Sequence, residues 1–166
     1  MVSFKRLLKH LTMNRWQVNQ AFPRQSLNAI EKAIKAGESA YVGEIRFVVE
    51  GALDGTPLFK GQPARSRAID IFSQLRIWDT EHNNGLLIYL LLADRAVEIV
   101  ADRGIHSKVG SEEWGKICRK MEAAFKQANY ETGVVRGIET ITQHLLKHFP
   151  DASAGQNELP DKPVVM

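Results

Sequence analysis

In several stretches of the chain, apolar residues recur every three or four positions, which is the spacing of an amphipathic helix. One such stretch covers about residues 4–11. Boundary signals flank the others, since Ser26 suits an N-cap, Gly37 suits a helix end, and Pro150 cannot continue a helix. The pattern predicts four further helices, over residues 26–36, 63–76, 111–125 and 131–149.

Three other stretches have the pattern of strands. Residues 41–50 place Ile45 and Phe47 on one face, and residues 85–92 are apolar at nearly every position, as in a strand covered on both faces. Residues 96–101 follow after a turn that is too short for a crossover, so this strand should pair antiparallel with the one before it. The first two strands should be parallel, with a right-handed crossover between them.

Helices before, between and after these strands predict an α/β fold, a three-layer α/β/α sandwich over a small mixed sheet. Residues 51–62 contain three glycines and Pro57, which predicts a loop with a short extra strand at Leu58 and Phe59. Residues 151–166 lack periodicity and contain two prolines, which predicts a disordered tail. The expected organisation is an arm over residues 1–22, a domain over 23–150 and that tail.

Composition adds bounds to this fold. The 166 residues are 44% hydrophobic and 25% charged, which is typical of one globular domain. Cys118 is the single cysteine, so no internal disulfide can form, and its place in an apolar helical stripe predicts an inert core thiol in a reducing compartment. No apolar run approaches the length of a membrane span and no cleavable leader is visible, so we expect a cytoplasmic protein.

Charge is distributed unevenly along the chain. Residues 1–36 hold seven Lys or Arg and one Glu, a balance of +6, whereas residues 37–166 hold 15 Lys or Arg and 18 Asp or Glu, a balance of −3. The two parts sum to the net +3 of the whole chain. The folded part is therefore acidic and lacks a basic stripe with aromatics, which argues against nucleic-acid binding.

The basic character is concentrated in the first helix, which has an apolar face and a basic face. Two interpretations stay open for this helix: it docks on its own domain or on a protein partner such as a second subunit, or it anchors the protein on an anionic membrane surface at the inner face of a membrane. The apolar positions are Phe4, Leu7, Leu8 and Leu11, and the polar ones are Lys5, Arg6, Lys9 and His10.

The predicted topology brings polar residues to one edge of the sheet. The second strand begins near Gly85 and the antiparallel third strand ends near Ala101, so the segments beside those points should meet. Carboxylate and amide oxygens suit calcium or magnesium. Alternatively, these are turn residues, a surface ion pair and solvated histidines. The residues concerned are Asp79, Glu81, His82, Asn83 and Asn84 on one side, Asp102, Arg103 and His106 on the other, and Glu38 and Ser39 from the start of the first strand.

Motifs of several enzyme classes are absent from the sequence. It contains no G-x-S-x-G, no H-E-x-x-H, no G-x-x-x-x-G-K and no G-x-G-x-x-G after a strand. A thiolate phosphatase would need an arginine shortly after its cysteine, and Ala124 stands six positions after Cys118. Any hydrolysis of a phosphate ester would therefore have to be assisted by a metal.

Three segments resemble the TPM domain family: residues 71–75 (IFSQL), 82–90 (HNNGLLIYL) and 97–106 (VEIVADRGIH). The resemblance extends over about residues 43–150 and implies an α/β sandwich. It also implies acid phosphatase activity or calcium binding, which are described for members of the family. Transferred to this chain, such a site would use Asp79, Asn83, Asn84 and Asp102, with Asp79 and Asp102 as the catalytic candidates.

Three functions follow from these observations. The first is a soluble TPM-type binding or accessory module that takes a divalent cation, with calcium or magnesium as the expected ion and no required cofactor. The alternative is a metal-dependent acid phosphatase working at Asp79 and Asp102. The second alternative is a peripheral membrane-surface protein that uses Lys5, Arg6 and Lys9.

Overall fold

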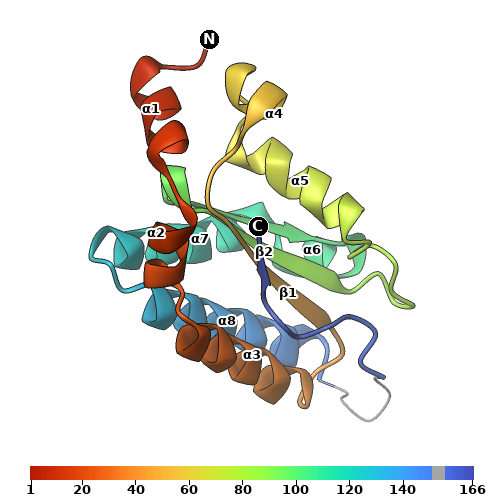
Figure 1. Ribbon diagram of the computed structural model, residues 1–166. Coiled ribbons are helices and arrows are strands. Elements are labelled where there is room, and N and C mark those ends of the chain that lie inside the picture. Colours follow the sequence, from red (N-terminus) through yellow and green to blue (C-terminus); the bar gives the residue numbers. More distant parts are fainter. Residues whose placement is uncertain (151–155) are drawn as a thin grey trace.

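The computed structural model describes residues 1–150 and 156–166, and it contains a four-stranded mixed sheet in the order β3-β2-β1-β4 (Figure 1). β1 runs parallel to β2, with Phe47 opposite Ile88, and β2 runs antiparallel to β3, with Ile88 opposite Ile99. Both predicted pairings are confirmed. The strands are β1 (Glu44–Glu50), β2 (Gly85–Leu91), β3 (Ala96–Ala101) and β4 (Val164–Val165).

One face of the sheet is covered by long amphipathic helices. Phe47, Ile88 and Ile99 point from the strands into a core formed with the apolar stripes of these helices, of which Ile138 is fully buried. This core is the larger of the two, and its helices are α2 (Arg15–Ala21), α3 (Arg24–Glu38), α6 (Arg103–Val109), α7 (Ser111–Lys126) and α8 (Tyr130–His148).

Shorter helices cover the opposite face, so the protein has the three layers that the pattern predicts (Figure 1). Val48, Leu87 and Tyr89 alternate with the residues of the first core and pack against Ala68 and Ile71 of the second helical layer. That layer consists of α1 (Phe4–Thr12), α4 (Gly55–Phe59) and α5 (Ala64–Gln74). In the part of the chain that the structure describes, no helix is both long and apolar enough to cross a membrane.

The C-terminal segment is ordered, so the prediction of a disordered tail is wrong for residues 156–166. Val164 and Val165 pair with Val48 and Val49 of β1, and the amide of Gly51 donates to the carbonyl of Met166. Backbone pairing on a sheet edge needs no side-chain periodicity, which is why the pattern did not reveal it. Residues 151–155, also assigned to that tail, lie outside the described residues.

Two further predictions of local structure need correction. Residues 55–59 form the helix α4 and not an extra strand, with Leu58 buried and Phe59 exposed. β1 begins at Glu44, three residues later than predicted, although Tyr41 is buried in the core as its pattern indicated. A five-residue helix is too short to produce a readable period, so the glycines and Pro57 dominated that prediction.

Candidate functional site

A pocket of about 460 Å³ lies at the edge of the sheet where β1 and β2 begin. The end of α3, the start of β1, the loop before β2 and the C-terminal segment all contribute to it (Figure 1). We call it the acidic pocket because five carboxylates line it, against one lysine, Lys35. These carboxylates belong to Glu38, Glu44, Glu81, Glu158 and Asp161.

Three of these carboxylates converge. Glu38, Glu44 and Asp161 each offer an oxygen, and these oxygens all lie within 4.8 Å of one another. Glu44 is 5% exposed and Asp161 is 8% exposed, so the group is largely withdrawn from water. Within the described ranges, this is the one group of three or more acidic, histidine or cysteine side chains close enough to hold a metal ion.

Local folding fixes each carboxylate in place. Glu38 is the last residue of α3, and its Oε1 accepts a hydrogen bond of 2.7 Å from the amide of Ile45. Glu44 is the first residue of β1, and its amide donates to the carbonyl of Asn84 at 3.1 Å, which joins the starts of the two strands. Two of the three converging carboxylates are therefore placed by the ends of regular elements.

Glu44 also anchors the C-terminal segment. Its two carboxylate oxygens accept hydrogen bonds from the amides of Glu158 at 3.0 Å and Leu159 at 3.4 Å. The guanidinium of Arg46 donates to the carbonyl of Pro160 in the same segment. These contacts bring Asp161 to the pocket, more than a hundred residues away from Glu44 in the sequence.

The acidic groups perturb one another. Burial raises the pKa of Glu38 to about 9, against the hydrogen bond from Ile45, and the neighbouring Glu44 and Asp161 add to the rise. Burial likewise raises the pKa of Glu44, although the amides of Glu158 and Leu159 oppose this. A cation placed among these groups would favour their ionised forms.

Nearby cations are engaged elsewhere. Lys35 lines the pocket, but its ammonium lies 2.8 Å from Glu31. By contrast, the buried carboxylate of Glu50 at the other end of β1 is fully occupied, with two bonds from Arg67 at 2.8 and 2.9 Å and one from the hydroxyl of Tyr89 at 2.6 Å. Glu50 is thus a satisfied structural group, whereas the acidic pocket gathers negative charge.

Asn84 supplies a separate indication of a ligand. It lines the acidic pocket and is only 4% exposed, and its backbone N–H donates a hydrogen bond to Thr80 Oγ1 at 3.1 Å. Its side-chain oxygen Oδ1 is buried and has no hydrogen-bond partner among the described residues. A buried carbonyl oxygen without a partner is costly and calls for an explanation such as a bound ion or water.

The structure brings together about half of the residues that the sequence nominated. The amide of Glu81 donates to Glu158 at 3.0 Å, and the exposed ring of His82 stands at the pocket rim. The members found in the acidic pocket are Glu38, Ser39, Glu81, His82 and Asn84.

The remaining nominated residues have other roles. Asp79 is exposed and pairs with Arg76 at 2.8 Å, and the carbonyl of Asn83 accepts the amide of Gly104 at 3.0 Å. Asp102 caps α6, accepting from the amide of Arg103 at 2.7 Å. None of these lines the acidic pocket, nor do Arg103 and His106.

Sequence reasoning missed Glu44 and Asp161. Glu44 lies on the face of the predicted strand opposite Ile45 and Phe47, and nothing in the pattern indicates the segment that covers that face. Asp161 fell in the region expected to be disordered. One signal in the sequence could have pointed to Glu44, which follows Gly43 at the start of a strand that also contains the polar residues Arg46 and Glu50. The structure shows that all three polar side chains of this strand are buried.

Cys118 is not part of any site chemistry. Burial raises the pKa of its thiol to about 12, with Glu98 and Glu122 adding to the rise. A thiol with such a pKa is protonated at neutral pH and is a poor nucleophile.

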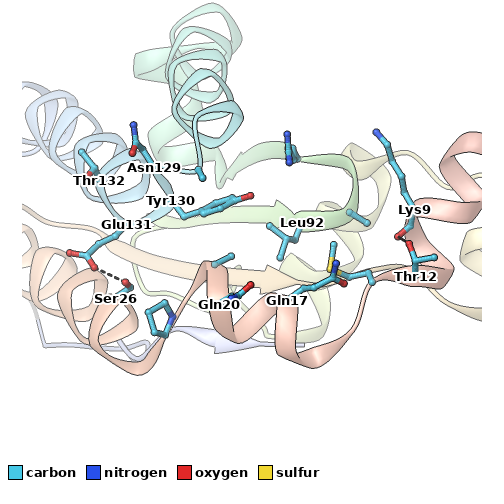
Figure 2. Close-up of a pocket in the computed structure, with 16 residues that line it drawn as sticks. Lys9, Thr12, Gln17, Gln20, Ser26, Leu92, Asn129, Tyr130, Glu131 and Thr132 are labelled. Atoms are coloured by element: carbon cyan, nitrogen blue, oxygen red, sulfur yellow. Dashed lines mark hydrogen bonds between the residues drawn. The ribbon is translucent and has the colours of Figure 1, made fainter.

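A second, larger cavity of about 970 Å³ lies toward the opposite end of the sheet (Figure 2). Figure 2 shows Lys9 of α1, Gln17 and Gln20 of α2, and Tyr130 at the start of α8 around it. Open α/β sheets often bind ligands at this end. The hydroxyl of Ser26 donates to Glu131 at 2.6 Å on one side of this cavity (Figure 2).

The two cavities differ in what they leave unsatisfied. The larger cavity is not lined by any of the buried polar atoms that lack a partner in the described parts of the chain, whereas the acidic pocket is lined by Asn84. The acidic pocket is therefore the stronger candidate site.

Comparison with known proteins places this fold. The sequence profile of the TPM domain matches residues 18–144. The NMR structure of the BA42 protein from the psychrophilic bacterium Bizionia argentinensis is 31% identical, with a TM-score of 0.75 over 86% of this chain and 93% of that one. The N-terminal domain of a protein from P. gingivalis has the same fold, at 17% identity and a TM-score of 0.64, over 94% of this chain and 100% of that one. No match was found among curated proteins. The profile match and the likeness to BA42 establish that this chain belongs to the TPM domain family.

Proposed function

We propose that this TPM domain is a binding module whose acidic pocket takes a divalent cation, calcium or magnesium. The observation that carries the proposal is the convergence of three carboxylates, two buried and one partly buried, in a pocket that is also lined by Asn84, whose Oδ1 is unpartnered among the described residues. The two features are independent, because an acidic cluster explains neither the burial nor the missing partner of an uncharged amide.

The donor set suits a hard cation. Glu38, Glu44, Asp161 and Asn84 offer oxygens only, and calcium and magnesium are bound through oxygen. Water would complete the six to eight ligands that calcium takes, and the open pocket has room for it. Calcium tolerates irregular coordination better than magnesium, which requires a nearly ideal octahedron, so calcium is the preferred ion here.

A bound cation would couple two distant parts of the chain. Glu38 and Glu44 belong to the sheet domain, whereas Asp161 belongs to the C-terminal segment that Glu44 holds through the amides of Glu158 and Leu159. Neutralising the three carboxylates would strengthen the attachment of this segment. The module would thereby respond to the concentration of the ion through a tighter attachment of the C-terminal segment that already lies on the sheet edge.

Phosphatase chemistry at Asp79 and Asp102 has less support, because neither residue belongs to a converging group of three carboxylates in the described part of the chain, although Oδ2 of Asp102 is buried and lacks a partner there. Asp79 is held by Arg76 at the surface, and Asp102 is engaged in capping α6. Metal-dependent hydrolysis at these residues stays a prediction of the family resemblance alone.

Isothermal titration of the chelator-treated protein with calcium and with magnesium tests the proposal. The variant Glu38→Gln/Asp161→Asn removes two carboxylates without changing side-chain size, and Asp79→Asn/Asp102→Asn removes two from the positions that the sequence nominated. We expect the first variant to weaken binding about tenfold or more, equivalent to about 1.4 kcal/mol, and the second to bind as wild type does.

Absence of binding by the wild type at millimolar calcium and magnesium would overturn the proposal. So would loss of binding in the Asp79→Asn/Asp102→Asn variant with retention in the pocket variant, which would move the site to the other location.

A further inference from the structure

Helix α1 lies on the domain in an unusual orientation. The guanidinium of Arg6 donates to both oxygens of Asp94, at 3.0 and 3.3 Å from Nε, and to the carbonyl of Gln62 at 2.8 Å. His10 is 3% exposed, accepts the amide of Leu53 on Nδ1 at 2.9 Å and bonds Asp94 through Nε2 at 3.0 Å. The helix therefore docks mainly through its polar side.

Its apolar stripe faces solvent as a consequence. Phe4 is 79% exposed, Leu8 51% and Leu11 64%, at the i, i+4, i+7 spacing of one helix face, while Leu7 alone packs against the core. A helix on a globular protein normally buries such a stripe. Three large apolar side chains on one exposed face need a reason beyond folding.

The exposed stripe continues onto neighbouring elements. α1 and α4 stand side by side at one end of the protein (Figure 1), and Leu11 and Phe59 line one groove of about 530 Å³. Phe59 is 65% exposed. We call Phe4, Leu8, Leu11 and Phe59 the N-terminal patch.

The charge around this patch has one dominant sign. Lys5 and Lys9 flank the stripe on α1 and Lys60 follows Phe59, all exposed, and residues 1–22 contain four Lys or Arg and no acidic residue. Asp54 is the acidic residue in the groove beside Arg15. Trp16 on α2 is a further exposed aromatic side chain, 66% accessible.

We propose that the N-terminal patch docks this protein on a membrane surface that contains anionic lipid. Phenylalanine and leucine side chains would enter the boundary between headgroups and acyl chains, and Lys5, Lys9 and Lys60 would meet lipid phosphates. A second copy of the chain fits this surface less well, because self-association would bring two strongly basic arms together. The proposal is independent of the cation site, which lies where β1 and β2 begin.

Flotation with phosphatidylcholine vesicles, with and without phosphatidylglycerol and in the presence of a chelator, tests this assignment. We expect wild type to bind the anionic vesicles and to be released by salt. The variant Phe4→Gln/Leu8→Gln/Leu11→Gln should partition to the vesicles about tenfold less or weaker, because it removes apolar area that would enter the lipid. These side chains are exposed in the folded protein, so the substitutions leave its core intact. The matched control is Ile69→Gln/Leu146→Gln, which removes exposed apolar side chains elsewhere and should bind as wild type does.

Lys5→Gln/Lys9→Gln provides a second variant that leaves the apolar stripe intact and should weaken binding to the anionic vesicles only. Failure of wild type to bind anionic vesicles, or equal binding by the patch variant, would overturn the proposal. Sedimentation velocity supplies a further outcome that would contradict the proposal. If wild type forms a dimer, the patch variant is a monomer and wild type does not bind vesicles, the patch is assigned to a second copy of this chain.

Discussion

At the end of the sheet where β1 and β2 begin, carboxylates are withdrawn from water, whereas at the α1 end, phenylalanine and leucine side chains are exposed to it. Both arrangements are unfavourable for the isolated domain, since buried charge and exposed apolar area each cost free energy. The two ends therefore differ in the kind of ligand that would offset this cost. Under the two proposals, a divalent cation would compensate the first end and a surface of anionic lipid would compensate the second.

Cation binding should produce the largest change in stability. At a calcium concentration about a hundredfold above the dissociation constant, mass action adds about 2.7 kcal/mol to the free energy of unfolding, and the melting temperature should rise by about 8 °C. Thermal unfolding followed by circular dichroism, with and without calcium, measures this shift. The Glu38→Gln/Asp161→Asn variant, which should bind about tenfold more weakly or worse, should gain at most about 1.4 kcal/mol at the same calcium concentration, and a shift equal to that of wild type would contradict a site in this pocket.

Detaching α1 should have the next largest effect. Asp94→Ala removes the acceptor shared by Arg6 and His10 and leaves a buried ring N–H unpaired, so we expect a loss of about 2 kcal/mol in the free energy of unfolding. Hydrogen exchange should become faster in residues 4–12 and stay unchanged in the acidic pocket. Unchanged exchange in α1 would contradict the view that its polar face holds it.

A further effect concerns pH in the absence of divalent ions. The pKa of Glu38 rises from a glutamate's ordinary 4.5 to about 9 in the folded protein, so between these values the folded state holds a proton that the unfolded state has released. Stability should therefore fall as pH rises from 5 to 9. The stability of Glu38→Gln should depend less on pH, and Asp79→Asn should behave as wild type does, in urea unfolding at each pH. A wild-type stability that is constant or increases with pH would contradict the buried state of this carboxylate.

Much of the fold could be predicted from the sequence. The apolar run at 86–92 identifies the central strand, the short turn before Ala96 requires antiparallel pairing, and the helical stripes identify both covering layers. The orientation of α1 could not be predicted, because a pattern that separates an apolar face from a polar face does not say which of the two faces packs against the domain. Only the partners Asp94 and Leu53, distant in sequence, decide it.

The candidate site was predictable in place but not in composition. Topology pointed to the edge of the sheet that carries the acidic pocket, and it included Glu38 and Asn84. Asp161 was out of reach, since the C-terminal segment is held by backbone pairing and by the amides that Glu44 accepts, neither of which leaves a period in the sequence. Asp79 and Asp102 were nominated for their chemistry, and their local partners Arg76 and Arg103 engage them instead.

A calcium titration of the isotopically labelled protein, followed amide by amide with NMR, tests the central claim most directly. The amides of Ile45, Glu158 and Leu159 donate to the pocket carboxylates, so their resonances should shift together and saturate with a single dissociation constant. Resonances near Asp79 and Arg103 should stay in place. Shifts confined to those positions, or none at millimolar calcium, would contradict a cation site built from Glu38, Glu44, Asn84 and Asp161.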